Sequence, residues 1–193
     1  MRRVPYILLL MLCLLPLSCR SLQERNSELL QAARKADSEG IEQALKDGAD
    51  ANASQYQNET VIGLLLSQYK RSHEDKRQRI ETAVTRLLEQ GADANATHHG
   101  FTPLLIATEQ GSATLVSRLL TYGANPDLET RAGLAPIWQA VIDNNYQIGQ
   151  ILLQVGANPN AKGLHQETPL QYLRANGFQK TRLMRYLRQY GGK

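Results

Sequence analysis

A five-residue motif recurs four times in this chain of 193 residues. Each copy begins with Gly-Ala and ends in Asn or Asp, and the copies start at Gly48, Gly91, Gly123 and Gly156, which are 43, 32 and 33 residues apart. A repeat of this period indicates a chain built from similar supersecondary units. A single unit cannot cover its own apolar face, so we expect neighbouring units to stack and to share one core.

Two helices are predicted within each period, and the third unit illustrates the reason. Thr102 can cap a helix N-terminus with its hydroxyl, and Pro103 suits the first helical position, where no amide donor is needed. Gly111 breaks this short helix. A second helix then ends at Gly123, because glycine tolerates the left-handed conformation. The apolar stripe of this second helix consists of Leu115, Val116, Leu119 and Leu120.

This pattern resembles the ankyrin repeat, whose period is about 33 residues and whose signature is Thr-Pro-Leu-His. Thr102-Pro103-Leu104 and Thr168-Pro169-Leu170 match the first three residues of that signature, and Ala135-Pro136-Ile137 is a variant of it. In the family, the histidine joins loops by hydrogen bonds. It is absent here, and the corresponding positions hold Gly63, Leu105, Trp138 and Gln171. Trp138 is expected to have a structural role.

The resemblance covers residues 28–191 and implies an all-α ankyrin-repeat solenoid of about five helix-turn-helix units. The units are expected at about residues 28–53, 54–96, 97–127, 128–160 and 161–191. The first unit lacks Thr-Pro-Leu and is expected to cap the stack. The second is about ten residues longer than its neighbours. Its extra length falls in the charged stretch 69–79, which predicts an exposed longer loop or an extended helix.

Residues 1–18 are predicted to form a signal peptide that is cleaved during export. Arg2 and Arg3 provide a positive start, and the apolar run that follows is shorter than the roughly 20 residues that a membrane-spanning helix needs. The Leu-Pro-Leu-Ser segment before Cys19 resembles a bacterial lipobox, which predicts a lipid on Cys19. Pro16 departs from the lipobox pattern, and an ordinary secretory signal is the alternative.

Residues 19–27 are expected to be a short tether between Cys19 and the repeats. No cysteine follows Cys19, so neither a disulfide nor a thiolate metal site can hold the fold. These features predict a periplasmic protein that is lipid-anchored to a membrane. The outer membrane is favoured, because Arg20 stands where an Asp would signal retention in the inner membrane. A soluble periplasmic protein is the alternative.

Charge is unevenly distributed along the chain. Residues 20–96 carry 11 basic and 13 acidic side chains, residues 97–161 carry 2 and 4, and residues 162–193 carry 7 and 1. The basic end favours an acidic partner or an anionic lipid surface. A solvated last helix that ends in Arg182, Arg185 and Arg188 is the alternative.

No catalytic constellation is recognised in the sequence. Serine is not found in a Gly-x-Ser-x-Gly elbow, and no glycine-rich phosphate loop is present. The adjacent histidines His98 and His99 lack a third ligand at a helpful spacing, so no metal site is predicted. Basic residues are not interleaved with aromatic ones in a nucleic-acid-binding pattern. We therefore predict a protein that is not an enzyme, and that has no cofactor, no nucleic-acid partner and no small-molecule substrate.

The predicted function is binding of a protein partner along the loop tips and inner helices, as the resemblance implies. The corresponding positions in the second unit are Tyr56, Gln57 and Glu59, and those in the third are His98, His99, Phe101, Glu109 and Gln110. Those in the last two units are Arg131, Leu134, Asp143, His165 and Glu167. Phe101 and Leu134 precede a helix at equivalent places, where an exposed apolar side chain suits an interface anchor. Packing of Phe101 on its neighbouring loop is the alternative.

Small exported ankyrin proteins resemble immunity proteins that protect a bacterium from an antibacterial effector. The prediction is therefore an immunity protein that binds and neutralises a toxin, such as a secreted phospholipase of the type VI kind. An inhibitor needs only a rigid complementary surface, which a repeat stack provides at low entropic cost. The alternative is a periplasmic scaffold or an accessory subunit of an envelope complex.

Overall fold

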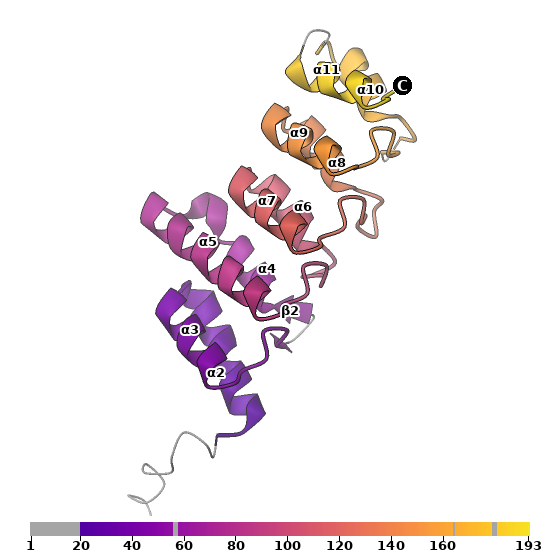
Figure 1. Cartoon of the computed structure of the whole chain (residues 1–193). Coiled ribbons are helices and arrows are strands. Elements are labelled where there is room, and N and C mark those ends of the chain that lie inside the picture. The colour runs from indigo at the N-terminus through magenta and orange to yellow at the C-terminus, as the bar shows by residue number, and fades with distance from the viewer. Residues whose placement is uncertain (1–19, 56–57, 164, 179–180) are drawn as a thin grey trace, which may run out of the picture.

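The computed structural model describes residues 20–55, 58–163, 165–178 and 181–193, and in this part of the chain five helix pairs stack in sequence order (Figure 1). The first three pairs are α2 (Leu22–Lys35) and α3 (Ser38–Lys46), α4 (Val61–Leu66) and α5 (Glu74–Glu89), and α6 (Pro103–Glu109) and α7 (Ala113–Thr121). The last two are α8 (Pro136–Ile142) and α9 (Tyr146–Gln154), and α10 (Pro169–Ala175) and α11 (Arg182–Gln189). The predicted all-α repeat solenoid is confirmed. A short hairpin, formed by β1 (Ser54–Gln55) and β2 (Glu59–Thr60), was not predicted.

The helix starts follow the capping chemistry read from the sequence. The Thr102 hydroxyl accepts a hydrogen bond from the Leu105 amide at 3.1 Å, and Pro103 is the first residue of α6. Thr60 and Thr168 cap α4 and α10 in the same way. Ala135 leaves α8 without a side-chain cap, although Pro136 still supplies the helical φ at its first position.

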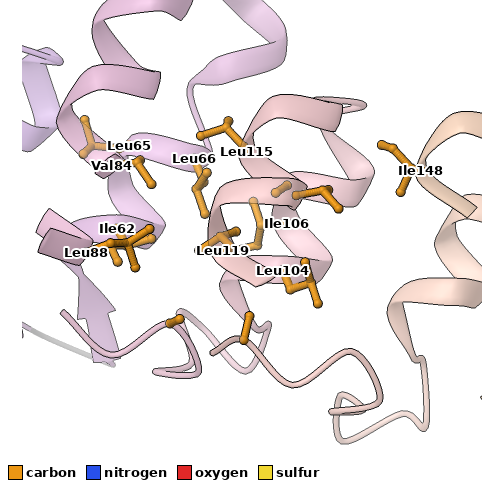
Figure 2. Close-up of a cluster of buried hydrophobic side chains, with 14 of the residues drawn as sticks. Ile62, Leu65, Leu66, Val84, Leu88, Leu104, Ile106, Leu115, Leu119 and Ile148 are labelled. Atoms are coloured by element: carbon orange, nitrogen blue, oxygen red, sulfur yellow. The ribbon is translucent and has the colours of Figure 1, made fainter. Parts of the chain in front are cut away.

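One continuous apolar core runs from Leu29 in α2 to Leu187 in α11. Figure 2 shows Leu66 of α4 and Leu115 of α7 among the side chains that fill the space between consecutive helix pairs. Both side chains are fully buried, and such burial stabilises the fold by about 1.5–3 kcal/mol for each leucine. Because each pair covers its neighbour, stability is shared along the stack.

The charged insertion of the second unit is an extended helix rather than a long loop. A turn of 3-10 helix at Tyr69–Arg71 leads into α5, which has 16 residues where α3, α7 and α9 have nine each. The hydroxyl of Tyr69 donates to Glu81 at 2.6 Å, and burial together with this bond raises the pKa of Tyr69. The Lys70 amide donates to Gln110 of the next unit at 2.8 Å. The insertion is therefore bonded both within its own unit and to the unit that follows.

The expected tether needs correction, because α2 already begins at Leu22. Ser21 and Glu24 form a reciprocal cap at its start. Arg25 donates to the Asp47 carbonyl at 2.6 Å, and the side chain of Asn26 accepts from the Asp50 amide at 2.8 Å. The predicted signal peptide and Cys19 lie outside the described residues. Among the helices that are described, none has the length and apolar content needed to cross a bilayer.

A ladder of Asn and Asp side chains joins the loops of successive units. The Asn52 amide group donates to the Gly91 carbonyl at 3.1 Å and its oxygen accepts from the Asp93 amide at 2.7 Å. Asn95 and Asn160 make the same pair of bonds to the loops that follow them. These bonds satisfy backbone groups that no helix uses, and they hold the loops in line on one side of the stack (Figure 1).

Candidate protein-binding surface

In the part of the chain that the structure describes, four short hairpins each lie just before one of the inner helices, which are α4, α6, α8 and α10. In the second unit, Ser54 pairs with Thr60. In the third, the His98 amide donates to the Phe101 carbonyl at 2.8 Å and the Phe101 amide donates back at 3.0 Å. The fourth and fifth hairpins are closed by bonds from Thr130 to Leu134 and from Gly163 to Glu167. The residues just before the four helices therefore occupy equivalent places in a row, and they are Glu59, Phe101, Leu134 and Glu167.

Phe101 and Leu134 differ in exposure although their places in the repeat are equivalent. The Phe101 side chain is 45% exposed, so it is free to contact a partner. Leu134 is partly buried against the core, and its amide donates to the Thr130 hydroxyl at 3.2 Å. The two positions are therefore not equally exposed, because Leu134 is partly buried and packs against the core.

Ile142 is an exposed apolar residue of this surface that the sequence reasoning missed. It is the seventh and last residue of α8, as Glu109 is of α6, and its side chain is 51% exposed. Ile142 directly follows Val141 in the sequence, and no sequence motif marks it as exposed. Alignment with the exposed Glu109 in the previous unit is the signal that could have identified it.

His98 is buried and was wrongly predicted to contact a partner. Its side chain is 6% exposed, and its Nδ1 accepts a hydrogen bond from the Thr60 amide at 3.2 Å. Burial lowers the pKa of His98, and the neighbouring charge of His99 lowers it further. His98 thus replaces, from the following loop, the histidine that is missing at Gly63.

Trp138 has the structural role that was expected of it. Its indole nitrogen donates to the Ala161 carbonyl at 3.0 Å, and its ring meets that of Tyr172 edge to face at 5.6 Å. These contacts join the fourth unit to the fifth. Trp138 and His98 therefore both link neighbouring units with a ring nitrogen.

Glu59 belongs to a polar network on the first two hairpins. Arg34 of α2 donates to Glu59 at 2.8 Å and to Gln55 at 2.9 Å. The bond from Arg34 lowers the pKa of Glu59. The Nε2 atom of His99 lies 3.8 Å from the second carboxylate oxygen of Glu59. A partner that bound Glu59 would compete with these internal contacts.

The other predicted contact residues differ in how available they are. Gln110 accepts from the Lys70 amide, and Asp143 accepts from Gln139 at 2.9 Å. Glu167 is partly buried. The exposed members of the predicted set are His99, Glu109, Arg131, Asp143 and His165, together with Phe101. Tyr56 and Gln57 lie outside the described residues.

An open depression of about 400 Å³ lies elsewhere, between the outer helices α5 and α7. Its lining is polar and consists of Gln78, Glu81, Thr82, Thr85, Arg86, Glu89, Thr114 and Arg118. The depression forms because α5, which the insertion lengthens, extends beyond the shorter α7 beside it. Within the described residues, no group of three or more His, Cys, Asp or Glu side chains is placed to hold a metal ion.

Comparisons with known proteins agree with the repeat architecture. A family model described as "Ankyrin repeats (3 copies)" matches residues 29–130 and 76–163. Putative ankyrin repeat protein YahD of Escherichia coli (strain K12) is 25% identical over 202 residues, which cover 83% of this chain and 94% of that protein.

Two animal proteins share a shorter stretch with this chain. Human ankyrin repeat and SOCS box protein 16 is 35% identical over 95 residues, which are 49% of this chain and 21% of that protein. The B-cell lymphoma 3 protein homolog of Mus musculus is 33% identical over 97 residues, which are 49% of this chain and 22% of that protein. The chain thus spans about a fifth of the length of these two relatives.

Proposed function

Because this chain belongs to the ankyrin-repeat family, we propose that it is a non-catalytic module that holds a protein partner against its hairpins and inner-helix ends. Ankyrin repeats are protein–protein interaction modules. The observation that carries the proposal is the exposure of Phe101 and Ile142 on consecutive units, at 45% and 51%. Large apolar side chains that stay exposed on a rigid scaffold are suited to be interface anchors.

The backbone beneath these two anchors is fixed before any partner arrives. The Phe101 hairpin is closed by two backbone bonds, and the helix that follows it is capped by Thr102. Ile142 ends a helix whose other apolar residues are buried in the core. Little conformational entropy is then lost on binding, so that most of the contact energy appears as affinity.

The partner that we propose is an antibacterial toxin, such as a secreted phospholipase effector, which the protein neutralises on the periplasmic side of the membrane. The signal-like residues 1–18 and the lipobox-like segment before Cys19 support export and anchoring. Neutralisation requires a complementary surface and no chemistry, which agrees with a repeat stack of this size.

A survival assay tests this proposal in the native bacterium. The gene is deleted, and the strain is then grown in contact with sister cells that deliver their toxins. We expect the deletion strain to be killed by its sisters and to be rescued by the wild-type gene. The F101A/I142A double variant should fail to rescue. The matched double variant Y122A/V155A changes two exposed apolar residues at the ends of α7 and α9, outside the predicted set, and should still protect. Equal survival of the deletion strain and its parent would refute the immunity role and favour a scaffold in the cell envelope.

A further inference from the structure

The last helix of the stack separates its apolar and basic residues onto two sides. Leu183, Met184 and Leu187 of α11 are buried in the core. The three arginines of the same helix, Arg182, Arg185 and Arg188, are exposed. They recur every three residues and span about 9 Å along the helix axis. We call this set the arginine face.

The arginine face carries charge that the rest of the unit does not neutralise. Residues 162–193 contain seven basic side chains and one acidic side chain, whereas residues 20–161 contain 13 basic and 17 acidic ones. Every salt bridge found among the described residues joins two residues within 20–99. None of them includes an arginine of the arginine face. Arg182 lies 5.1 Å over the ring of Tyr146, which holds this guanidinium at the surface.

We propose that the arginine face docks the C-terminal unit onto a bilayer that contains anionic phospholipids. Guanidinium groups bind phosphate oxygens bidentately, and basic residues near an anionic surface are attracted without fixed complementary positions. An acidic protein would need carboxylates at matching places, and arginine anchors in such interfaces sit in well-packed pockets. The arginine face instead lies on the open side of a helix.

Exposed aromatic residues lie at both ends of α11, and a tyrosine is a residue type that suits the level of the lipid headgroups. Phe178 precedes α11 and Tyr190 follows it, and both side chains are more than a third exposed. The apolar residues of α11 are engaged in the core, so the helix cannot insert into the bilayer. The attachment is therefore peripheral and weakens as salt screens the charges.

This inference goes beyond the proposed function, because it concerns a different end of the molecule and does not depend on a toxin partner. The arginine face lies at the opposite end of the stack from α2 (Figure 1). With a lipid on Cys19, the protein would be attached at both ends. The hairpins that carry Phe101 and Leu134 would then be held along the membrane surface.

Vesicle co-sedimentation tests the proposal with residues 20–193, which contain the ten α-helices that the structure describes and the core that they share. Vesicles of phosphatidylcholine alone are compared with vesicles that also contain phosphatidylglycerol, at low and at raised salt. The R182Q/R185Q/R188Q variant is compared with the matched control R71Q/R79Q/R118Q. The control loses the same charge from exposed arginines in other units. Circular dichroism checks that all three proteins are folded.

We expect the wild type to bind only the vesicles with phosphatidylglycerol, and raised salt to release it. Loss of the arginine face should weaken binding roughly a hundredfold, because each of the three basic residues near the surface contributes about fivefold. The control should bind within about threefold of the wild type, as expected for surface changes remote from the contact. Equal weakening of both variants, or equal binding to both vesicle types, would overturn the proposal. So would binding to soluble poly-L-glutamate without binding to vesicles, which would assign the face to an acidic protein.

Discussion

The imidazole ring of His98 occupies the space that a side chain on Gly63 would need. A Cβ atom built on Gly63 would lie 2.1 Å from Cγ of His98, far inside contact distance. The ring comes from the loop of the third unit and accepts the Thr60 amide at the start of α4. One histidine therefore fills a gap in the second unit and joins it to the third.

The first prediction is that G63A destabilises the protein, although Gly to Ala within a helix normally stabilises by up to about 1 kcal/mol. The added methyl group must displace the His98 ring, so we expect a loss of about 1–3 kcal/mol in the free energy of unfolding. In an H98A background the same change should be neutral or stabilising, because the space is then empty. Urea unfolding of the two single variants and the double variant measures this coupling. An identical effect of G63A in both backgrounds would contradict the contact.

The second prediction concerns pH. Burial holds the pKa of His98 below its ordinary value of 6.5, so the folded protein takes up this proton less readily than the unfolded chain does. The contribution of His98 to stability is therefore fully present above about pH 6.5 and is lost as pH falls through the folded-state pKa. His99, Glu59 and Arg34 are the charged or titratable groups nearby.

Unfolding free energies measured between about pH 7.5 and about pH 5 check this prediction. The wild type should lose stability across this range, because protonated Nδ1 can no longer accept from the Thr60 amide. H98N offers an oxygen to that amide and does not titrate, so its profile should be flatter. H165N, which changes an exposed histidine of the fifth unit, is the matched control and should follow the wild type. If H98N and the wild type have profiles of the same slope, His98 is not the group responsible.

The third prediction uses Asp127, which interrupts the asparagine ladder. Its carboxylate accepts from the Asn158 amide at 2.8 Å, but it has no hydrogen to donate to the Gly156 carbonyl. D127N would restore the donor that Asn52, Asn95 and Asn160 provide in the other loops. We expect a gain of about 0.5–1.5 kcal/mol in thermal unfolding experiments. N95D removes the same bond one unit earlier and should lower stability, so two changes of the same sign would argue against this explanation.

The fourth prediction separates the two residues that the hairpin pattern treats as equivalent. F101A should leave the melting temperature nearly unchanged, because the ring is largely exposed, and it should weaken partner binding by about 2–4 kcal/mol if the ring is an anchor. L134A should instead lower the melting temperature, since Leu134 packs on the core. Calorimetric titration with the toxin, identified as the effector whose deletion from the attacking sister cells abolishes killing, measures the binding. Unchanged affinity of F101A would move the contact to another surface of the stack.

The sequence by itself determined the number and type of the repeats. The period of the motif, the caps at Thr102 and Thr168, and the prolines that follow them were all readable. These features depend on hydrogen bonds within a few residues and on helical spacing, which neighbouring units do not alter. The expected length of the insertion was also correct, but its form as a helix depended on contacts to Glu81 and Gln110 in the folded stack.

Only the tertiary structure decided which residues of the repeat are available to a partner. Phe101 and Leu134 have equivalent positions, yet one is exposed and the other packs on the core. The sequence predicted that His98 contacts a partner from a loop. In the structure its ring is buried in the space beside Gly63, 35 residues earlier in the chain. Exposure and burial are set by the side chains of the adjoining unit, and a local pattern contains no information about how those side chains fill the space between two helix pairs.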